Sequence, residues 1–257
     1  MSERSPAYDA CPLRAVLDAA EPRPADDGDR GDKKNYAQRL SRALAVEVAA
    51  RLRPHFQGIL PTEDEGHETE IGGAGGKKRL DVCVWDRQLG LVLDVSIKTY
   101  SFRDYDGKRK RLGRMTKNVV RNDMELRAEA AKIHERQPYA VLIGLMFVPM
   151  VACTDGEHDH SSFAHMVATF RNRTGRDGHD DKRFDRFEAF YIGLYEADGD
   201  RRGQVRFFDV RNNPPQNGKS RREDTLTFEA LTAEVRRLVD RRNSKGIEWG
   251  EPAGEDE

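Results

Sequence analysis

Polar residues alternate with apolar ones along residues 91–98, a segment whose composition is otherwise that of a buried strand. Side chains alternate between the two faces of a strand, so Asp94, Ser96 and Lys98 share one face. The other face is fully apolar. A second short strand is expected just before it, over residues 80–85. Charged groups placed among so many valines and leucines suggest a site that neutralises their charge.

Asp81 opens the earlier strand, and antiparallel pairing of the two strands would bring it near Ser96 and Lys98. Hard divalent cations such as Mg²⁺ prefer carboxylate oxygens and often take only one or two from the protein. A neighbouring lysine can orient or deprotonate an attacking water and stabilise charge on a phosphate. These residues therefore predict a metal-dependent phosphate site. The alternative is a structural hairpin whose polar face meets solvent.

The spacing of these residues resembles the signature of the PD-(D/E)xK nucleases, a family that includes many type II restriction endonucleases. Asp81, a gap of 14 residues and then Ser96-Ile97-Lys98 follow its pattern. Ser96 stands where the family has an acid, and Leu80 stands where it has proline. The resemblance implies a DNA endonuclease that uses Mg²⁺, or Mn²⁺ as a substitute, and leaves a 5′-phosphate and a 3′-hydroxyl. In it Lys98 positions the attacking water, and the biological role is restriction or anti-phage defence.

Two residues can replace the acid that is missing at position 96. Asp94 lies two residues upstream on the same strand face. One restriction-enzyme group carries Ser-x-Lys on the strand and its acid on the following helix, in an Arg-x-Glu-Ala setting that residues 127–130 resemble. We therefore favour Glu129, followed by Asp94. Together with Asp81, these are the metal ligands that the resemblance implies.

Two further acids are candidates for the same role. Glu125 lies one helical turn before Glu129. Glu70 precedes a glycine-rich loop, and in this family an acid often reaches the site from the element ahead of the first strand. The alternatives are a solvated helix face for Glu125 and Glu129, and a solvated acidic loop for Glu70.

Basic residues are dense in an insertion over residues 100–114, directly after Lys98. Lysine and arginine can bind DNA phosphates, while arginine and asparagine can also read base edges in the major groove. The alternative is a charged surface loop with no ligand. The predicted DNA-contacting residues are Arg103, Lys108, Arg109, Lys110, Arg111, Arg114, Lys117, Asn118, Arg121 and Asn122.

Hydrophobic spacing predicts one α/β domain, with a mixed central β-sheet flanked by helices as in restriction endonucleases. The buried side of the third helix is expected to hold Val119, Val120, Met124, Ala128, Ala131 and Ile133. The predicted helices span residues 12–20, 35–52, 115–136, 163–171 and 226–242, with a Thr227 cap on the last, and the predicted strands span 80–85, 91–98, 139–149, 187–195 and 205–210.

The composition divides the chain into a flexible N-terminal segment (1–34), a nuclease-like domain (35–243) and an acidic, disordered tail (244–257). The charged fraction is 35% and the net charge is −1, so a DNA-binding surface has to be local. Three scattered cysteines, no apparent signal peptide and no apolar run that could span a bilayer predict a cytoplasmic protein without membrane contact.

The expected partners are double-stranded DNA and a second copy of the chain, since many such enzymes dimerise to cut both strands. A cognate methyltransferase or another defence protein is a possible further partner. Two rival functions stay open. One is a nuclease-fold protein that binds DNA without cutting it, and the other is a protein-interaction module in which the hairpin is structural.

Overall fold

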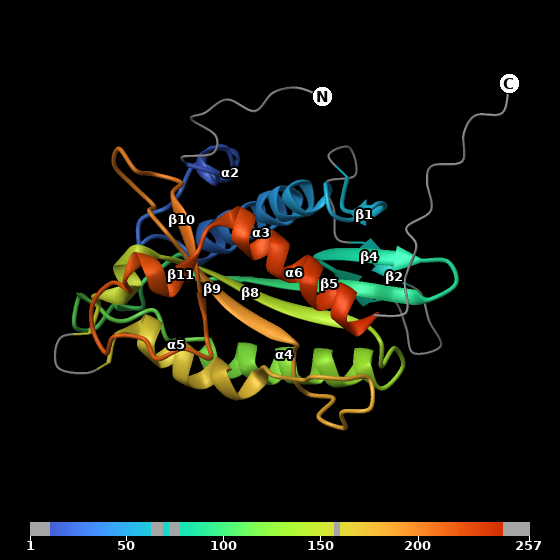
Figure 1. Cartoon of the computed structure of the whole chain (residues 1–257). Coiled ribbons are helices and arrows are strands. Elements are labelled where there is room, and N and C mark those ends of the chain that lie inside the picture. Colours follow the sequence, from blue (N-terminus) through green and yellow to red (C-terminus); the bar gives the residue numbers. More distant parts are fainter. Residues whose placement is uncertain (1–10, 63–68, 72–77, 157–159, 244–257) are drawn as a thin grey trace, which may run out of the picture.

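A seven-stranded sheet forms the centre of the protein (Figure 1). The computed structural model describes residues 11–62, 69–71, 78–156 and 160–243. In spatial order the strands are β1 (Ile59–Leu60), β4 (Val82–Asp86), β5 (Gly90–Thr99), β8 (Val141–Pro149), β9 (Ala189–Tyr195), β10 (Val205–Asp209) and β11 (Thr225–Leu226). β5, β8 and β9 run parallel, and the outer pairs are antiparallel. The predicted mixed sheet is confirmed.

Helices cover both faces of this sheet (Figure 1). α3 (Arg30–Leu52) and α6 (Phe228–Arg242) lie on one face, and α4 (Val119–His134) and α5 (Ser162–Phe170) lie on the other. The short helix α2 (Arg14–Ala20) packs beside α3. No helix in the described part of the chain has the length and apolar content needed to cross a bilayer.

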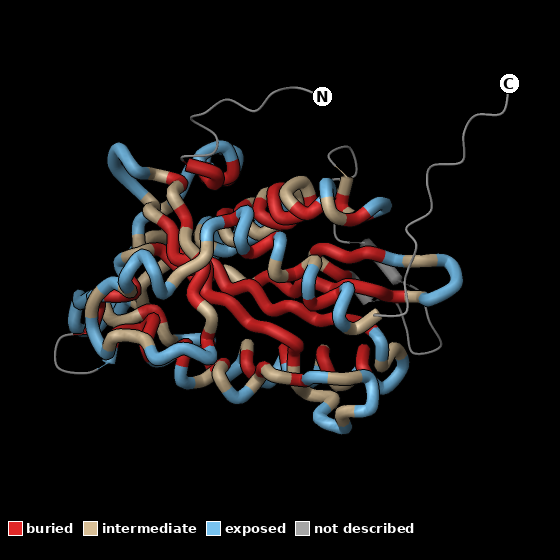
Figure 2. Tube along the Cα trace, viewed as in Figure 1, coloured by how far each residue is buried: buried red, intermediate tan, exposed pale blue. Residues whose placement is uncertain are grey.

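The central strands β5, β8 and β9 are buried along nearly their whole length, as Figure 2 shows. On β8, Ile143 and Leu145 pack into the core beneath α3 and α6, whereas Leu142 and Met146 pack into the core beneath α4 and α5. This double burial explains why residues 139–149 are apolar without alternation. The sheet therefore separates two apolar cores.

Helix α3 extends further toward the N-terminus than the sequence indicated. α3 begins at Arg30 because the Asp29 carboxylate accepts hydrogen bonds from the backbone N–H groups of Gly31 and Asp32. The helix predicted over 12–20 is present as α2, and its Leu17 is buried in the shared core. Residues 11–34, expected in a flexible segment, thus contribute two helical stretches to the fold. The proposed tail, 244–257, lies outside the described residues.

The predicted buried face of α4 is partly wrong. Val120 and Met124 are 68% and 64% exposed, and Ala128 is also exposed. Val119 and Ile133 are buried as predicted. The inward face runs through Val119, Asp123, Leu126, Ala130, Ile133 and His134. Two polar residues, Asp123 and His134, lie on that face. A prediction from hydrophobicity alone therefore placed the buried face about one residue away from the observed one.

Two small hairpins lie outside the main sheet. β2 (Thr69–Ile71) pairs with β3 (Lys78–Leu80), and β6 (Tyr105–Asp106) pairs with β7 (Arg111–Leu112). The second hairpin corrects the prediction of a basic loop over residues 100–114. Its turn consists of the four residues 107–110, a common length for a hairpin loop that the charge-based interpretation overlooked.

One buried carboxylate joins four segments of the chain. Glu188, 5% exposed, accepts hydrogen bonds at Oε1 from Arg176 (3.1 Å) and Arg242 (2.6 Å). Its Oε2 accepts from the Leu142 backbone N–H at 2.6 Å, and the His134 ring on α4 lies 3.5 Å from Oε1. Burial alone would raise the pKa of Glu188, but the nearby His134 and Arg242 hold this pKa below its usual value.

We expect Glu188→Gln to lower the free energy of unfolding at pH 7 by about 3–5 kcal/mol, because it leaves buried cations without their carboxylate. Because the folded-state pKa of Glu188 is lowered, this contribution to stability is fully present above about pH 4.3, the pKa of an unfolded glutamate. It is lost as the pH falls through the folded-state pKa. Urea denaturation between pH 3 and about pH 7 measures it. The exposed Glu135→Gln is the control, and a difference that does not change with pH would contradict the interpretation.

Gly144 on β8 lies beside Ser96 on β5. A Cβ at Gly144 would lie 2.2 Å from the Phe190 ring, which is stacked on Phe170 with ring centroids 4.8 Å apart. Since the stacked ring has little room to move, this position requires glycine.

Gly144→Ala should destabilise the protein by about 1–3 kcal/mol, because the added methyl displaces a packed aromatic ring. Thermal unfolding of the variant measures the effect. Gly107→Ala serves as the matched control, since its Cβ would come no closer than 4.0 Å to the Tyr105 ring. Equal melting temperatures for the two variants would show that the ring can move.

Candidate functional site

Strand β5 presents the predicted polar residues to the α4 side of the sheet. Asp94 and Ser96 are almost completely buried, at 0% and 1% exposure, and Lys98 is partly buried. The neighbouring strand places Leu142 beside Asp94 and Gly144 beside Ser96. Glycine leaves the Ser96 position without a bulky lateral neighbour on that strand. The predicted alternation therefore holds along this half of β5.

The Ser96 hydroxyl joins the strand to helix α4. Its Oγ donates to Oε1 of Glu129 at 2.5 Å and lies 3.4 Å from Oδ2 of Asp94. A serine hydroxyl has one proton, so the shorter contact is the main hydrogen bond. Glu125, one turn earlier, instead pairs with Arg121 at 2.7 Å on an exposed part of the helix. Of the two helix acids considered, Glu129 reaches the strand.

Asp81, the residue just before β4, contacts the same part of β5. Its Oδ2 accepts the backbone N–H of Ile97 at 2.6 Å. Strand β4 begins at Val82, so the Asp81 side chain bonds β5 immediately beyond the last paired residue of β4. Asp81 and Glu129 thus contact consecutive residues, one at the backbone of Ile97 and the other at the side chain of Ser96.

The expected alternation of side chains between the two faces of the sheet breaks down near the turn that joins β4 and β5. The register of β4 and β5 shifts between Val84 and Trp85. As a result Leu91 joins the core beneath α4, whereas Leu93 and its alternate neighbours face α3 and α6. The irregularity lies near the turn, away from the Asp81 and Ser96 end, so it leaves the polar residues on one face.

The donor atoms around Ser96 suit a hard cation. Asp81, Asp94 and Glu129 offer carboxylate oxygens, the ligands that Mg²⁺ prefers. Within the described ranges, no group of three or more histidine, cysteine, aspartate or glutamate residues is placed so that it could hold a metal ion. Mg²⁺ commonly takes one or two protein carboxylates and completes its shell with water and phosphate oxygens. The residues present therefore fit such an ion in chemical type.

Glu70 lies in β2, opposite Arg79 of β3. The structure describes only the backbone of these two residues. The predicted contribution of the Glu70 carboxylate falls outside what is described and stays a prediction.

The predicted DNA-contacting residues divide into two groups. Seven are exposed, namely Lys108, Arg109, Lys110, Arg111, Lys117, Asn118 and Arg121. Three others hold the protein together: Arg103 donates to the Gly113 carbonyl at 2.8 Å, Arg114 donates to the His160 carbonyl at 2.7 Å, and the Asn122 amide donates to the Tyr100 hydroxyl at 2.8 Å. Two of these contacts fix the base of the β6–β7 hairpin, whose basic tip projects into solvent.

Sequence reasoning missed two residues near the site. Tyr100, immediately after β5, is buried, and burial raises the pKa of its hydroxyl, which accepts from Asn122 on α4. Gly144 permits the close packing beside Ser96 described above. A lone glycine inside an apolar strand is a usable signal for such an approach, whereas the partner of Tyr100 has no signal in the sequence.

Comparison with known proteins adds no relative. No family model matches this chain, and no match was found among curated proteins or solved structures.

Proposed function

We propose that this protein is a Mg²⁺-dependent DNA endonuclease of the PD-(D/E)xK type, with Glu129 supplying the acid that is missing at position 96. The observation that supports it best is the 2.5 Å hydrogen bond between Ser96 and Glu129. It links the serine of a Ser-x-Lys strand motif to the acid of the Arg-x-Glu-Ala segment, 33 positions further on. The contact by itself would also satisfy a buried hydroxyl, so it is the setting of both residues in these two motifs that favours the nuclease.

In this proposal Asp81 and Glu129 bind the metal, and Asp94 is the alternative ligand. Bound there, Mg²⁺ would stabilise negative charge on the scissile phosphate and acidify a water. Lys98, on the same face as Ser96, positions that water and stabilises the phosphate charge. The water oxygen bonds to phosphorus, the bond to the 3′-oxygen breaks, and the products are a 5′-phosphate and a 3′-hydroxyl.

The substrate in this proposal is double-stranded DNA. The exposed cations at the β6–β7 tip, Lys108 to Arg111, belong to the first hairpin after the strand that carries Lys98. They can bind phosphates on either side of the cleaved bond without needing a net positive protein. We extend the proposal to a restriction-endonuclease-like fold, a homodimer, a cytoplasmic location and a role in restriction or anti-phage defence.

The strongest test compares acids one helical turn apart. With Mg²⁺ or Mn²⁺, Asp81→Ala, Lys98→Ala and Glu129→Gln should each slow plasmid cleavage by about 100-fold or more, because each removes a charge used in the transition state. Glu125→Gln should cleave like the parent. Asp94→Asn identifies the second ligand, and circular dichroism checks that every variant is folded.

Equal activity of Glu129→Gln and Glu125→Gln would refute the relocated acid. If the parent binds DNA but does not cleave it with any divalent metal, the non-cutting rival is correct. That rival has a structural basis, since Asp81 and Glu129 are already hydrogen-bonded by the protein.

DNA binding should depend on the hairpin tip. Replacing Lys108, Arg109 and Lys110 by alanine should reduce the slope of log K against log salt by about 0.9 for each DNA phosphate that the protein no longer neutralises. Fluorescence anisotropy with a duplex at several salt concentrations measures this slope. Arg87→Ala, at the exposed turn between β4 and β5, is the control. Binding that does not change with salt would favour the protein-interaction module.

A further inference from the structure

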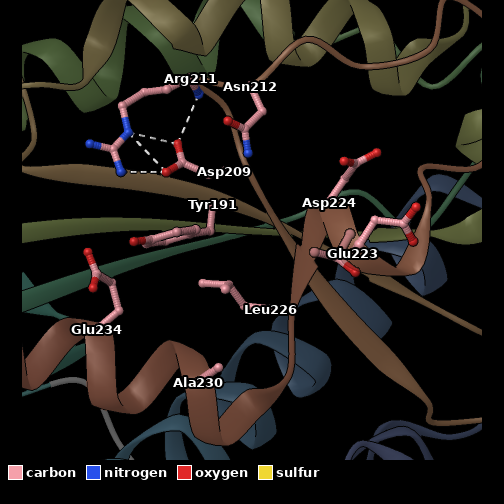
Figure 3. Close-up of a pocket in the computed structure, with 10 residues that line it drawn as sticks. Tyr191, Asp209, Arg211, Asn212, Glu223, Asp224, Leu226, Ala230 and Glu234 are labelled. Carbon is pink, nitrogen blue, oxygen red and sulfur yellow. Dashed lines mark hydrogen bonds and ion pairs between the residues drawn. The ribbon is translucent and has the colours of Figure 1, made fainter.

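A second concave site lies on the opposite face of the sheet from Ser96. Its cavity, of about 280 Å³, is bordered by β9, β10, β11 and the start of α6 (Figure 3). Tyr191 and the neighbouring core residues belong to the α3 and α6 side, whereas the Ser96 site faces α4. The two sites can therefore be tested separately.

The buried hydroxyl of Tyr191 points to a ligand in this cavity. Tyr191 is 1% exposed, and its hydroxyl oxygen has no hydrogen-bond partner among the described residues. In Figure 3 the hydroxyl lies on the same side of the cavity as the Arg211 guanidinium and the Glu234 carboxylate. Burial raises the pKa of Tyr191, so the hydroxyl stays protonated at neutral pH. A buried polar group without a partner is unfavourable and rare, and a bound polar group would satisfy it.

The lining of the cavity is rich in carboxylates, which arginines from outside it neutralise. One guanidinium, that of Arg211, lines it together with four carboxylates, those of Asp209, Glu223, Asp224 and Glu234. Arg237 and Arg221 pair with three of these acids from outside the lining. Arg241 also lowers the pKa of Glu234, so four guanidinium groups balance the four carboxylates, and the preference for a cation rests on the acceptor atoms inside the cavity.

Glu234 keeps the capacity to accept from a ligand. Each of its oxygens accepts one hydrogen bond from Arg237, at 2.8 and 2.6 Å. A carboxylate has about four acceptor positions, so positions remain on both oxygens. Leu226 and Ala230 supply an apolar wall to the same cavity. The site thus combines a hydroxyl, an acceptor carboxylate and a surface for methylene groups.

We propose that this cavity binds the guanidinium group of an alkylguanidinium ligand, which donates N–H groups to the Tyr191 hydroxyl oxygen and to the Glu234 carboxylate. A guanidinium has five donors in one plane, so it can reach both acceptors at once, and its weak hydration lowers the cost of entering a buried site. Its alkyl stem lies against Leu226 and Ala230. A cavity of this size suits a small ligand or a single arginine side chain.

Calorimetric titration with n-butylguanidinium tests this proposal, with n-butylurea as an uncharged ligand of the same shape. The folded parent protein should bind n-butylguanidinium at least tenfold more tightly than n-butylurea. Tyr191→Phe and Glu234→Gln should each weaken binding at least fivefold. The exposed Glu229→Gln, on the same helix but outside the cavity, should bind like the parent.

Tyr191→Phe also separates ligand binding from folding. Because it removes a hydroxyl without a partner, its melting temperature should equal or exceed that of the parent. N-acetyl-arginine methylamide then distinguishes the sources of the guanidinium. If it binds as tightly as n-butylguanidinium, an arginine of a polypeptide is the ligand, and if only n-butylguanidinium binds, the ligand is a free small cation. Equal affinity for n-butylguanidinium and n-butylurea, or unchanged affinity in Tyr191→Phe, would overturn the proposal.

Discussion

The parallel pairing of β5 with β8 is the constraint on which the candidate site depends. Two parallel neighbours require a connection that carries the chain back across one face of the sheet, and α4 lies in that connection. The same crossover that covers the face therefore brings a helix over the polar side of β5. Glu129 meets Ser96 because of this connection, although the two residues are far apart in the sequence.

Helix α4 satisfies buried polar groups at two places on that face. Glu129 accepts from Ser96, and further along the helix His134 lies beside Glu188. Apolar residues such as Ala130 fill the space between them. Buried charges are tolerated only where hydrogen bonds or counter-charges replace water, and both sites supply them. The position of α4 is thus fixed by polar contacts as well as by apolar packing.

The opposite face of the sheet has a different character. Its core beneath α3 and α6 is largely apolar, and the Tyr191 hydroxyl there lacks a partner among the described residues and borders a cavity. The sheet lies between that cavity and Ser96, so a ligand on one side does not contact residues on the other. This separation allows two binding sites in one domain.

Local signals in the sequence determined most of the elements. Alternation along residues 91–98 predicted the face shared by Asp94, Ser96 and Lys98, and Thr227 predicted the start of α6, where its hydroxyl accepts from the Ala230 N–H. These features depend on neighbours within a few residues, so a linear pattern can carry them.

The tertiary structure decided what joins distant residues. It selected Glu129 over Glu125 for the contact with Ser96, turned Val120 and Met124 outward, and placed Gly144 beside Ser96. Each outcome depends on how a helix is rotated or how two strands are registered. A rotation of about 100° separates adjacent positions on a helix, and hydrophobicity cannot fix it where the inward face itself carries polar residues such as Asp123 and His134.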